Sequence, residues 1–226
     1  MVDFSRSVAL LGEDAFDRLA HLRVAVVGVG GVGSWCAEAL LRTGVRNLTL
    51  MDDDVVAPSN INRQCPATAH TMGRLKVEVM RERLLEINPD ATVEAVPSRY
   101  TGGLPCGGAV DVIVDAIDSV DCKAELILAA TAAGIPLFSS MGAALRLDPT
   151  KVMVQRFDRI AGDGLARALR QRFRKMGRFP AAKFKCVTTS ELPLRRPDLK
   201  TKGSLMPVTA AFGMALAAEV MKTVLK

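Results

Sequence analysis

Two short stretches in the first third of the chain contain residues suited to nucleotide chemistry. The first is GVGGVG, and its glycines are Gly28, Gly30, Gly31 and Gly33. Glycines at this spacing permit a tight turn and a close approach of phosphate to the backbone, and the following helix offers free N–H groups to the anion. Asp52 lies about 20 residues further on, where a carboxylate can accept both ribose hydroxyls. This pattern predicts an adenosine nucleotide site.

The second stretch, DDDVVAPSNINRQ at residues 52–64, favours cleavage of a triphosphate over hydride transfer with NAD. A triphosphate that is being split needs cationic and polar donors on its phosphates through the transition state. Asn60 and Arg63 could supply these donors. Lys76, near the start of a predicted helix, could reach the same phosphates. We therefore predict that ATP is bound and cleaved here.

Acidic residues at the carboxyl edge of the predicted sheet are candidates for a metal ion. Asp118 ends the apolar run VIVDAID, and a carboxylate at the end of such a strand suits Mg²⁺. Asp118 is therefore the predicted magnesium ligand. Asp53 and Asp54 have no predicted role beyond solvation of the surface.

The elements that must position these residues follow an alternating pattern. Apolar runs predict strands at 23–27, 47–53, 91–97, 111–118 and 135–140, and helical spacing predicts helices at 32–45, 73–89 and 123–134. Alternation of strands and helices implies a doubly wound, mostly parallel α/β sheet of the Rossmann type. Residues 142–157 are expected to form two antiparallel strands around an Asp-Pro turn, and residues 164–177 a basic helix.

The C-terminal part of the chain is predicted to contain a loop or crossing segment and a final helix. The loop or crossing segment spans residues 177–204, and the apolar helix spans 204–226. A membrane span is one reading of this helix. Glu219 and Lys222, together with the interruptions at Pro207 and Gly213, favour a buried core or dimer helix instead.

Composition and charge predict one domain over residues 1–226, with a nucleotide-binding core at 1–150 and a basic portion at 151–226. Residues 1–150 carry 13 Lys and Arg against 19 Asp and Glu, whereas residues 151–226 carry 17 against 5. This asymmetry indicates a polyanionic partner, and a solvated helix face is the alternative. Few aromatic residues accompany the basic ones, which favours contact with a duplex or backbone over stacking on single strands.

Cysteine usage and the N-terminus suggest a cytoplasmic protein. The chain has five cysteines: Cys36, Cys65, Cys106, Cys122 and Cys186. None forms a C-x-x-C pair and their number is odd, which argues against a disulfide framework and against a paired-thiolate zinc site. The first residues also lack the charged start and apolar run of a signal peptide.

Several segments resemble the superfamily of ThiF, MoeB and the ubiquitin-activating enzymes, whose members adenylate a carboxylate with ATP. These segments are GVGGVGSWCAEALLRTGV, DDDVVAPSNINRQ, GRLKVEVMRERLLEINP and VDAIDS. Within the superfamily, FSRSVALLGEDAF, GAALRLDPTK, SELPLRRP and GSLMPV resemble the tRNA threonylcarbamoyladenosine dehydratase branch, also called TcdA, CsdL or YgdL. Sulfur-carrier activators usually carry two C-x-x-C zinc pairs, which this sequence lacks, and the basic C-terminal third suits tRNA.

The resemblance implies a reaction and a role for each candidate residue. The reaction would be ATP-dependent cyclisation of N6-threonylcarbamoyladenosine in tRNA through an acyl-adenylate. The glycine loop and Asp52 would hold adenosine and ribose; Asn60, Arg63 and Lys76 would hold the phosphates; Asp118 would hold Mg²⁺. The resemblance also allows a monovalent cation (Na⁺ or K⁺) and a cysteine desulfurase or sulfur-acceptor partner.

Two further candidates for catalysis, Arg6 and Cys186, also have plain structural interpretations. Arg6 resembles the arginine that crosses into the partner's active site in superfamily homodimers, but it could be an ordinary surface residue. Cys186 matches a cysteine of some dehydratases, and Lys183 and Lys185 could lower its pKa and make it a nucleophile. Alternatively, it is a small apolar residue on a short strand.

Other functions remain open at the level of sequence. The first alternative is adenylation of the C-terminal carboxylate of a sulfur-carrier or ubiquitin-like protein. The second is a binding module that has lost its chemistry, although Arg63, Lys76 and Asp118 argue against such a loss. Oxidoreduction with NAD is a weaker alternative.

Overall fold

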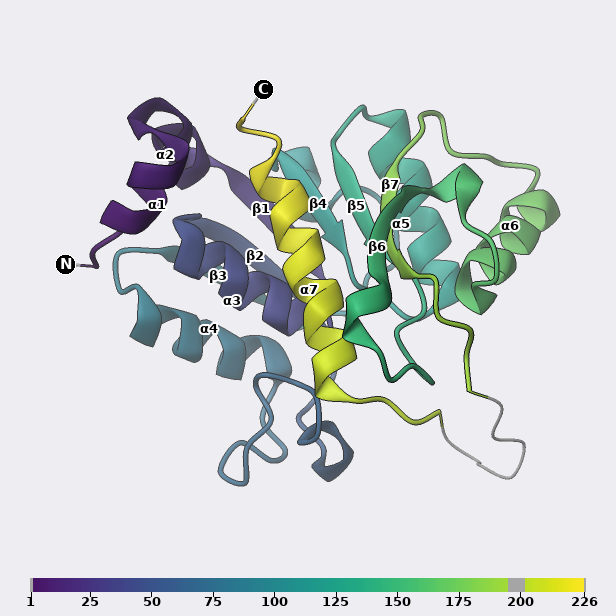
Figure 1. The fold of residues 1–226 in the computed structure, drawn as a ribbon, viewed down its shortest axis with the longest axis horizontal. Helices are drawn as coiled ribbons and strands as arrows, with labels where there is room; N and C mark the ends of the chain where they lie inside the picture. Colours follow the sequence, from purple (N-terminus) through teal and green to yellow (C-terminus); the bar gives the residue numbers. More distant parts are fainter. Residues whose placement is uncertain (1, 195–201, 226) are drawn as a thin grey trace.

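A seven-stranded sheet forms the centre of the computed structural model, which describes residues 2–194 and 202–225 (Figure 1). The strand order is β3-β2-β1-β4-β5-β7-β6. All neighbouring strands are parallel except the antiparallel pair β6 and β7. The strands are β1 (Arg23–Val27), β2 (Asn47–Met51), β3 (Thr92–Val96), β4 (Val112–Asp115), β5 (Leu137–Ser140), β6 (Val152–Arg156) and β7 (Lys185–Thr189). The predicted mostly parallel α/β fold is confirmed.

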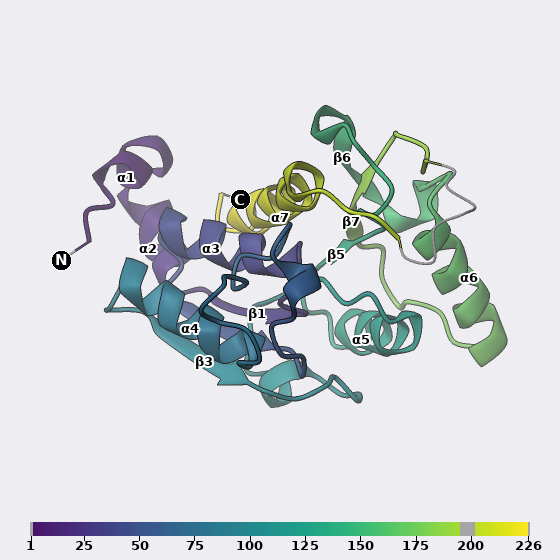
Figure 2. The same ribbon diagram turned by 90° about the horizontal axis from the view of Figure 1, so that it is seen from below.

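Helices cover both faces of this sheet. They are α1 (Ser5–Leu11), α2 (Glu13–His21), α3 (Gly33–Thr43), α4 (Lys76–Ile87), α5 (Val120–Ala132), α6 (Gly164–Met176) and α7 (Met206–Met221). Val24 and Val26 of β1 pack into one core cluster with α3, α4 and α7, whereas Ala25 and Val27 pack into a second cluster with α5 and α6. Figure 2 shows α7 and α5 on opposite sides of the sheet. Burial on both faces explains why β1 is a continuous apolar run.

The antiparallel strands differ from the prediction. Residues 142–157 do not form a hairpin; only β6 forms there, and its partner is β7 from the segment that was predicted to be a loop or crossing. The backbone of Leu145 has a left-handed φ of 60° and bonds instead to Gly203 and Leu194. Residues 195–201 of the predicted loop, and the end of the motif SELPLRRP, lie outside the described residues.

The predicted final helix is confirmed as α7, and it packs closely across α3. A Cβ added at Gly213 would lie 2.6 Å from the carbonyl oxygen of Val32, so glycine is required for this close approach. Among the described residues, no helix combines the length and the apolar character that crossing a membrane requires. The N-terminal helices α1 and α2 were not predicted, and no residue of α1 is buried.

Candidate functional site

The glycine-rich loop follows β1 and is packed against the turn that follows β4. Gly28 has a φ of 92°, and a Cβ there would lie 2.7 Å from the carbonyl oxygen of Ala116. A Cβ at Gly33, the first residue of α3, would overlap the carbonyl oxygen of Gly28. A Cβ at Gly31 would lie 3.2 Å from Cγ of Arg63. The loop therefore requires glycine for backbone conformation and close packing, and it brings Arg63 beside the predicted phosphate site.

Asp52 lies directly after β2 and is bound to the glycine loop. Its Oδ2 accepts the N–H of Val29 at 2.7 Å, and its Oδ1 accepts the N–H of Asp54 at 2.9 Å. Burial raises the pKa of the Asp52 carboxyl, and the charge of Lys76 and these backbone N–H groups oppose that rise. The position beside the glycine loop fits the predicted contact with ribose.

Lys76, which was predicted to lie near the start of a helix, is the first residue of α4, and its side chain is buried. Its Nζ lies 2.6 Å from Oδ2 of Asp54, and its N–H donates to the carbonyl oxygen of Asp54 at 3.0 Å. The Asp54 side chain is 66% exposed and that of Lys76 only 6%. Asp54 was predicted only to solvate the surface; the structure adds an ion pair that holds Lys76 at the edge of the sheet.

Asn60 and Arg63 lie on the segment between β2 and α4, which contains a short 3-10 turn at Pro58–Asn60. Oδ1 of buried Asn60 accepts the N–H of Ala57 at 2.9 Å. Nη1 of Arg63, which is partly exposed, donates to the carbonyl oxygen of Ser59 at 2.8 Å and to Oδ1 of Asn62 at 3.0 Å. Local bonds therefore organise both candidate phosphate donors.

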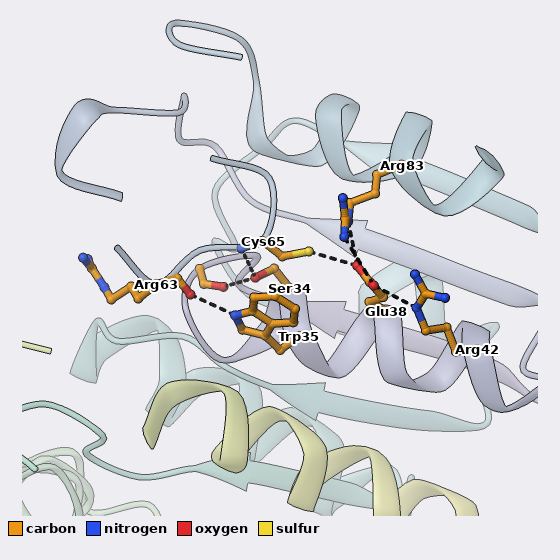
Figure 3. A network of polar contacts seen from close by, with 8 residues as sticks. Ser34, Trp35, Glu38, Arg42, Arg63, Cys65 and Arg83 are labelled. Carbon is orange, nitrogen blue, oxygen red and sulfur yellow. Dashed lines mark hydrogen bonds and ion pairs between the residues drawn. The ribbon is translucent and has the colours of Figure 1, made fainter. Parts of the chain in front are cut away.

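Side chains of helix α3 hold this segment in place by binding the segment's backbone (Figure 3). Nε1 of Trp35 donates to the carbonyl oxygen of Arg63 at 2.9 Å. Oγ of Ser34 accepts the N–H of Cys65 at 3.2 Å and donates to the carbonyl oxygen of Gly30 at 2.6 Å. The glycine loop and the segment that carries Arg63 are thus connected through one helix. The sequence analysis missed these contacts, which join residues far apart in the chain.

A buried carboxylate, Glu38, binds the same segment at Cys65, two residues after Arg63 (Figure 3). It accepts hydrogen bonds from Sγ of Cys65 at 3.0 Å, Nε of Arg83 at 2.6 Å and Nε of Arg42 at 2.8 Å. Burial by itself raises the pKa of Glu38, but the hydrogen bonds from Arg83, Cys65 and Arg42 outweigh it and hold the pKa at about 2. Glu38 thus joins α3, α4 and the Arg63 segment.

The substitution Glu38→Gln is expected to make the protein less sensitive to acid. The pKa of Glu38 falls from its ordinary value of 4.5 to about 2 on folding, so its stabilisation is complete above pH 4.5 and is lost as the pH falls towards 2. This shift corresponds to about 3 kcal/mol of unfolding free energy at pH 7. Urea unfolding of both proteins between pH 7 and pH 3 measures the difference, which should shrink in acid.

Arg42→Gln is the matched control for Glu38→Gln. The Arg42 side chain is 55% exposed and donates a single hydrogen bond to Glu38, so its loss is expected to cost less than about 1 kcal/mol. A difference between wild type and Glu38→Gln that stays constant with pH would contradict the role given to this carboxylate.

Asp118 requires a correction in its placement. β4 ends at Asp115, so Asp118 does not end the strand but lies three residues later, in the turn before α5. Its side chain is exposed at the carboxyl edge of the sheet and has no hydrogen bond or ion pair within residues 2–194 and 202–225. An open carboxylate there fits a hard cation such as Mg²⁺. The carboxylates of Asp52, Asp53 and Asp54 also converge within 4.8 Å of one another.

Cys186 lies in the core, on β7. The residue is 1% exposed, and burial raises the pKa of its thiol well above the usual range. The expectation that Lys183 and Lys185 lower this pKa was wrong, because Lys183 is exposed and Nζ of Lys185 pairs with Glu219 at 2.7 Å. The alternative of a small apolar residue on a short strand describes the observed environment, and a nucleophilic role stays a prediction.

Arg6 lies on α1, where it is exposed. Figure 1 shows α1 at the upper left, apart from the segment that follows β2 at the bottom. Val8 of α1 lines a hollow with Asn47 and Thr92, the first residues of β2 and β3, whereas the site lies beyond the other ends of the strands. Arg6 is therefore not part of the site that its own chain forms, so any contact with ATP would have to be made in another copy of the chain.

The fold and the site together define a nucleotide-binding α/β protein in which the segment that carries Arg63 lies beside the glycine-rich loop. Residues 4–226 match the ThiF family, and the chain belongs to that family. It is 35% identical to the tRNA threonylcarbamoyladenosine dehydratase of Escherichia coli K12, over 97% of this chain and 92% of the relative. It is also 35% identical to the Haemophilus influenzae enzyme of that name, over 94% and 89%.

Solved structures agree with these relatives. The crystal structure of the E. coli tRNA N6-threonylcarbamoyladenosine dehydratase, TcdA, matches with a TM-score of 0.90 and 36% identity, covering 98% of this chain and 93% of that one. A structure of the same enzyme in complex with ATP matches with a TM-score of 0.89 and 35% identity at the same coverage.

Proposed function

We propose that this chain is an ATP-dependent tRNA threonylcarbamoyladenosine dehydratase. Relatives of that name align over nearly its whole length, and one matched structure is a complex with ATP. The observation that carries the proposal is the position of Arg63 against the glycine loop, where its Cγ would lie 3.2 Å from a Cβ added at Gly31. This arrangement suits a nucleotide whose phosphates are displaced during the reaction.

In the first step, the threonyl carboxylate of the modified adenosine attacks the α-phosphorus of ATP. A phosphorus–oxygen bond forms, the bond to the β-phosphate bridging oxygen breaks, and pyrophosphate leaves. Arg63 and Asn60 would bind the phosphates, and Lys76 would exchange its bond to Asp54 for one to a phosphate oxygen. Asp118 would hold Mg²⁺, which neutralises phosphate charge when it is bound.

In the second step, the neighbouring carbamoyl group attacks the activated carbonyl and closes a ring. The bond between the carbonyl carbon and the oxygen that bridges to phosphorus breaks, AMP leaves with that oxygen, and a proton is released. The nucleoside thereby loses the elements of one water. Ring closure within one nucleoside benefits from high effective concentration, so this step needs little acid–base assistance from the protein.

We also propose that residues 1–226 act as one adenylation domain, in which 1–150 form the nucleotide-binding core and 151–226 the basic portion. Support comes from the sheet, since β6 and β7 of the basic portion extend the strands of the core. A homodimer, a monovalent cation and a sulfur-transfer partner stay predictions of the family resemblance, and a cytoplasmic site of action stays a prediction from cysteine usage and the N-terminal sequence.

Helix α6 offers the basic surface for tRNA. Two arginines of the helix and one just after it are engaged within the chain: Arg170 binds the carbonyl oxygens of Phe157 and Ile160, Arg172 pairs with Asp121, and Arg178 pairs with Glu125. Arg167, Arg174 and Lys175 are exposed and have no acidic partner in the described parts of the chain. These three cations are the ones available to phosphates of an RNA backbone.

The double substitution Arg167→Glu, Lys175→Glu is expected to weaken tRNA binding roughly tenfold and to reduce its salt dependence, because each lost phosphate contact lowers counterion release. ATP binding should be unchanged. Arg46→Glu is the matched control, since Arg46 is exposed at the amino edge of the sheet, away from α6. Filter binding at several salt concentrations measures the effect, and equal affinities for wild type and double variant would remove α6 from the interface.

Mass spectrometry of tRNA nucleosides tests the proposed function. The purified protein is incubated with ATP, Mg²⁺ and tRNA that carries threonylcarbamoyladenosine, and amine or alkaline buffers are avoided so that the cyclic product does not reopen. The expected result is an ATP-dependent loss of one water per modified nucleoside, with AMP formed in step. If the mass does not change although ATP binds tightly, the carboxylate of a small carrier protein becomes the better substrate.

A further inference from the structure

A fully buried ion pair lies beneath the turn that carries Asp118. Nζ of Lys123, on α5, is 2.9 Å from Oδ1 of Asp115 at the end of β4, and both side chains are 0% exposed. Charged residues are almost never fully buried without a partner, and two well-packed apolar residues often serve stability equally well or better. Stability alone therefore does not explain this pair.

Most hydrogen bonds of this pair go to one short turn, residues 115–117. Nζ of Lys123 also lies 2.9 Å from the carbonyl oxygen of Ile117 and 3.4 Å from that of Asp115. Asp115 in turn accepts the N–H of Ile117 at 3.2 Å and the hydroxyl of Ser139 at 2.7 Å. An ammonium group has three donors, and all three have acceptors within residues 115–117. The backbone before Asp118 is thus held from both its N–H and its carbonyl side.

The same turn supports the glycine loop. The N–H of Ala116 donates to the carbonyl oxygen of Val27 at 2.8 Å. The carbonyl oxygen of Ala116 is the atom that a Cβ at Gly28 would approach to 2.7 Å, and Cβ of Ala116 would lie 3.1 Å from one at Gly33. The position of this turn therefore influences both the placement of the glycine loop, which packs on it, and the placement of Asp118, which directly follows it.

We propose that Lys123 is a positioning residue which, with Asp115, fixes the distance between Asp118 and the glycine loop. This inference rests on the proposed function, because it concerns the magnesium and ATP of that reaction. Lys123 touches neither of them; it acts through the backbone of residues 115–117. Partners that orient a metal ligand typically contribute about 10-fold to 100-fold in metal affinity.

The test is the double substitution Asp115→Asn, Lys123→Met, which leaves no buried unpaired charge. ATP binding is measured by calorimetry across a range of Mg²⁺ concentrations, in the absence of tRNA, together with thermal unfolding. We expect a folded protein in which half-maximal enhancement of ATP binding by Mg²⁺ requires about tenfold more Mg²⁺. The single variant Ser139→Ala, which removes one bond to Asp115, should give a smaller shift in the same direction.

A second ion pair, in which only the carboxylate is buried, provides the control. Glu219 on α7 is 3% exposed and binds Nζ of Lys185, whose side chain is 50% exposed, at 2.7 Å. Neither residue belongs to the turn or to the glycine loop. Glu219→Gln is expected to lower thermal stability without changing the Mg²⁺ requirement. An unchanged Mg²⁺ requirement in a folded double variant would overturn the positioning role. Because this readout needs no tRNA, it remains decisive even if the dehydration assay gives no product.

Discussion

The substitution Arg63→Ala is expected to lower kcat/KM for ATP-dependent dehydration by about 10³-fold, because a cation that stabilises charge on a displaced phosphate acts mainly in the transition state. The fold should persist. Within the described residues, the Arg63 side chain bonds only to Ser59 and Asn62, while the contact that holds the segment, from Trp35, goes to the Arg63 backbone. Pyrophosphate release measures the rate, and circular dichroism measures the fold.

Arg74→Ala is the matched control for this prediction. Arg74 lies on the same segment, and its guanidinium pairs with Glu82 on the surface. Its loss should change kcat/KM by less than about threefold, as expected for an exposed ion pair. Turnover like that of wild type in Arg63→Ala would remove the assignment of Arg63 to the phosphates.

The variant Arg63→Ala can also test whether Arg6 acts in a partner's site. If Arg6 of one chain completes the site of another, a mixture of Arg6→Ala and Arg63→Ala proteins regains activity, because one site of each mixed dimer has both arginines. If Arg6 serves its own chain or no site, mixing restores nothing. The first outcome fits the position of α1, which lies away from the site of its own chain (Figure 1).

The elements that were predicted correctly are those whose formation depends on residues within one short stretch of sequence. β1 appears as an apolar run because Val24 and Val26 face one core cluster while Ala25 and Val27 face the other. The helix at 32–45 ends at Gly44, whose φ of 128° suits glycine. The pairing of β6 with β7 could not be predicted in this way, because it joins residues about 30 positions apart in the chain.

In the site, the residue types were predictable and their partnerships were not. The glycine loop and Asp52 follow a spacing rule, and the structure places them in contact through Val29. The role of Asp54 could not be predicted, since its exposure alone suggested solvation. The prediction that the pKa of Cys186 is lowered was wrong for a related reason. The lysines that neighbour it in the sequence are exposed, and burial of the thiol, which depends on the whole fold, raises its pKa.

The second large effect on kcat/KM is expected at Lys76, which pairs with Asp54. Lys76→Met is expected to lower kcat/KM by about 10²-fold to 10³-fold, because it removes a desolvated cation at the phosphates. Its length and apolar stem are kept, so the packing of the start of α4 should survive.

Asp54→Asn separates the two interpretations of this pair. The Asp54 side chain is 66% exposed, so water screens its attraction and Lys76 can turn to a phosphate at a cost of about 1 kcal/mol or less. Asp54→Asn should therefore change kcat/KM by less than about tenfold in either direction, which corresponds to 1.4 kcal/mol. If Asp54→Asn is as damaging as Lys76→Met, the pair itself is what the reaction needs, and Lys76 supports the segment after β2 instead of binding ATP.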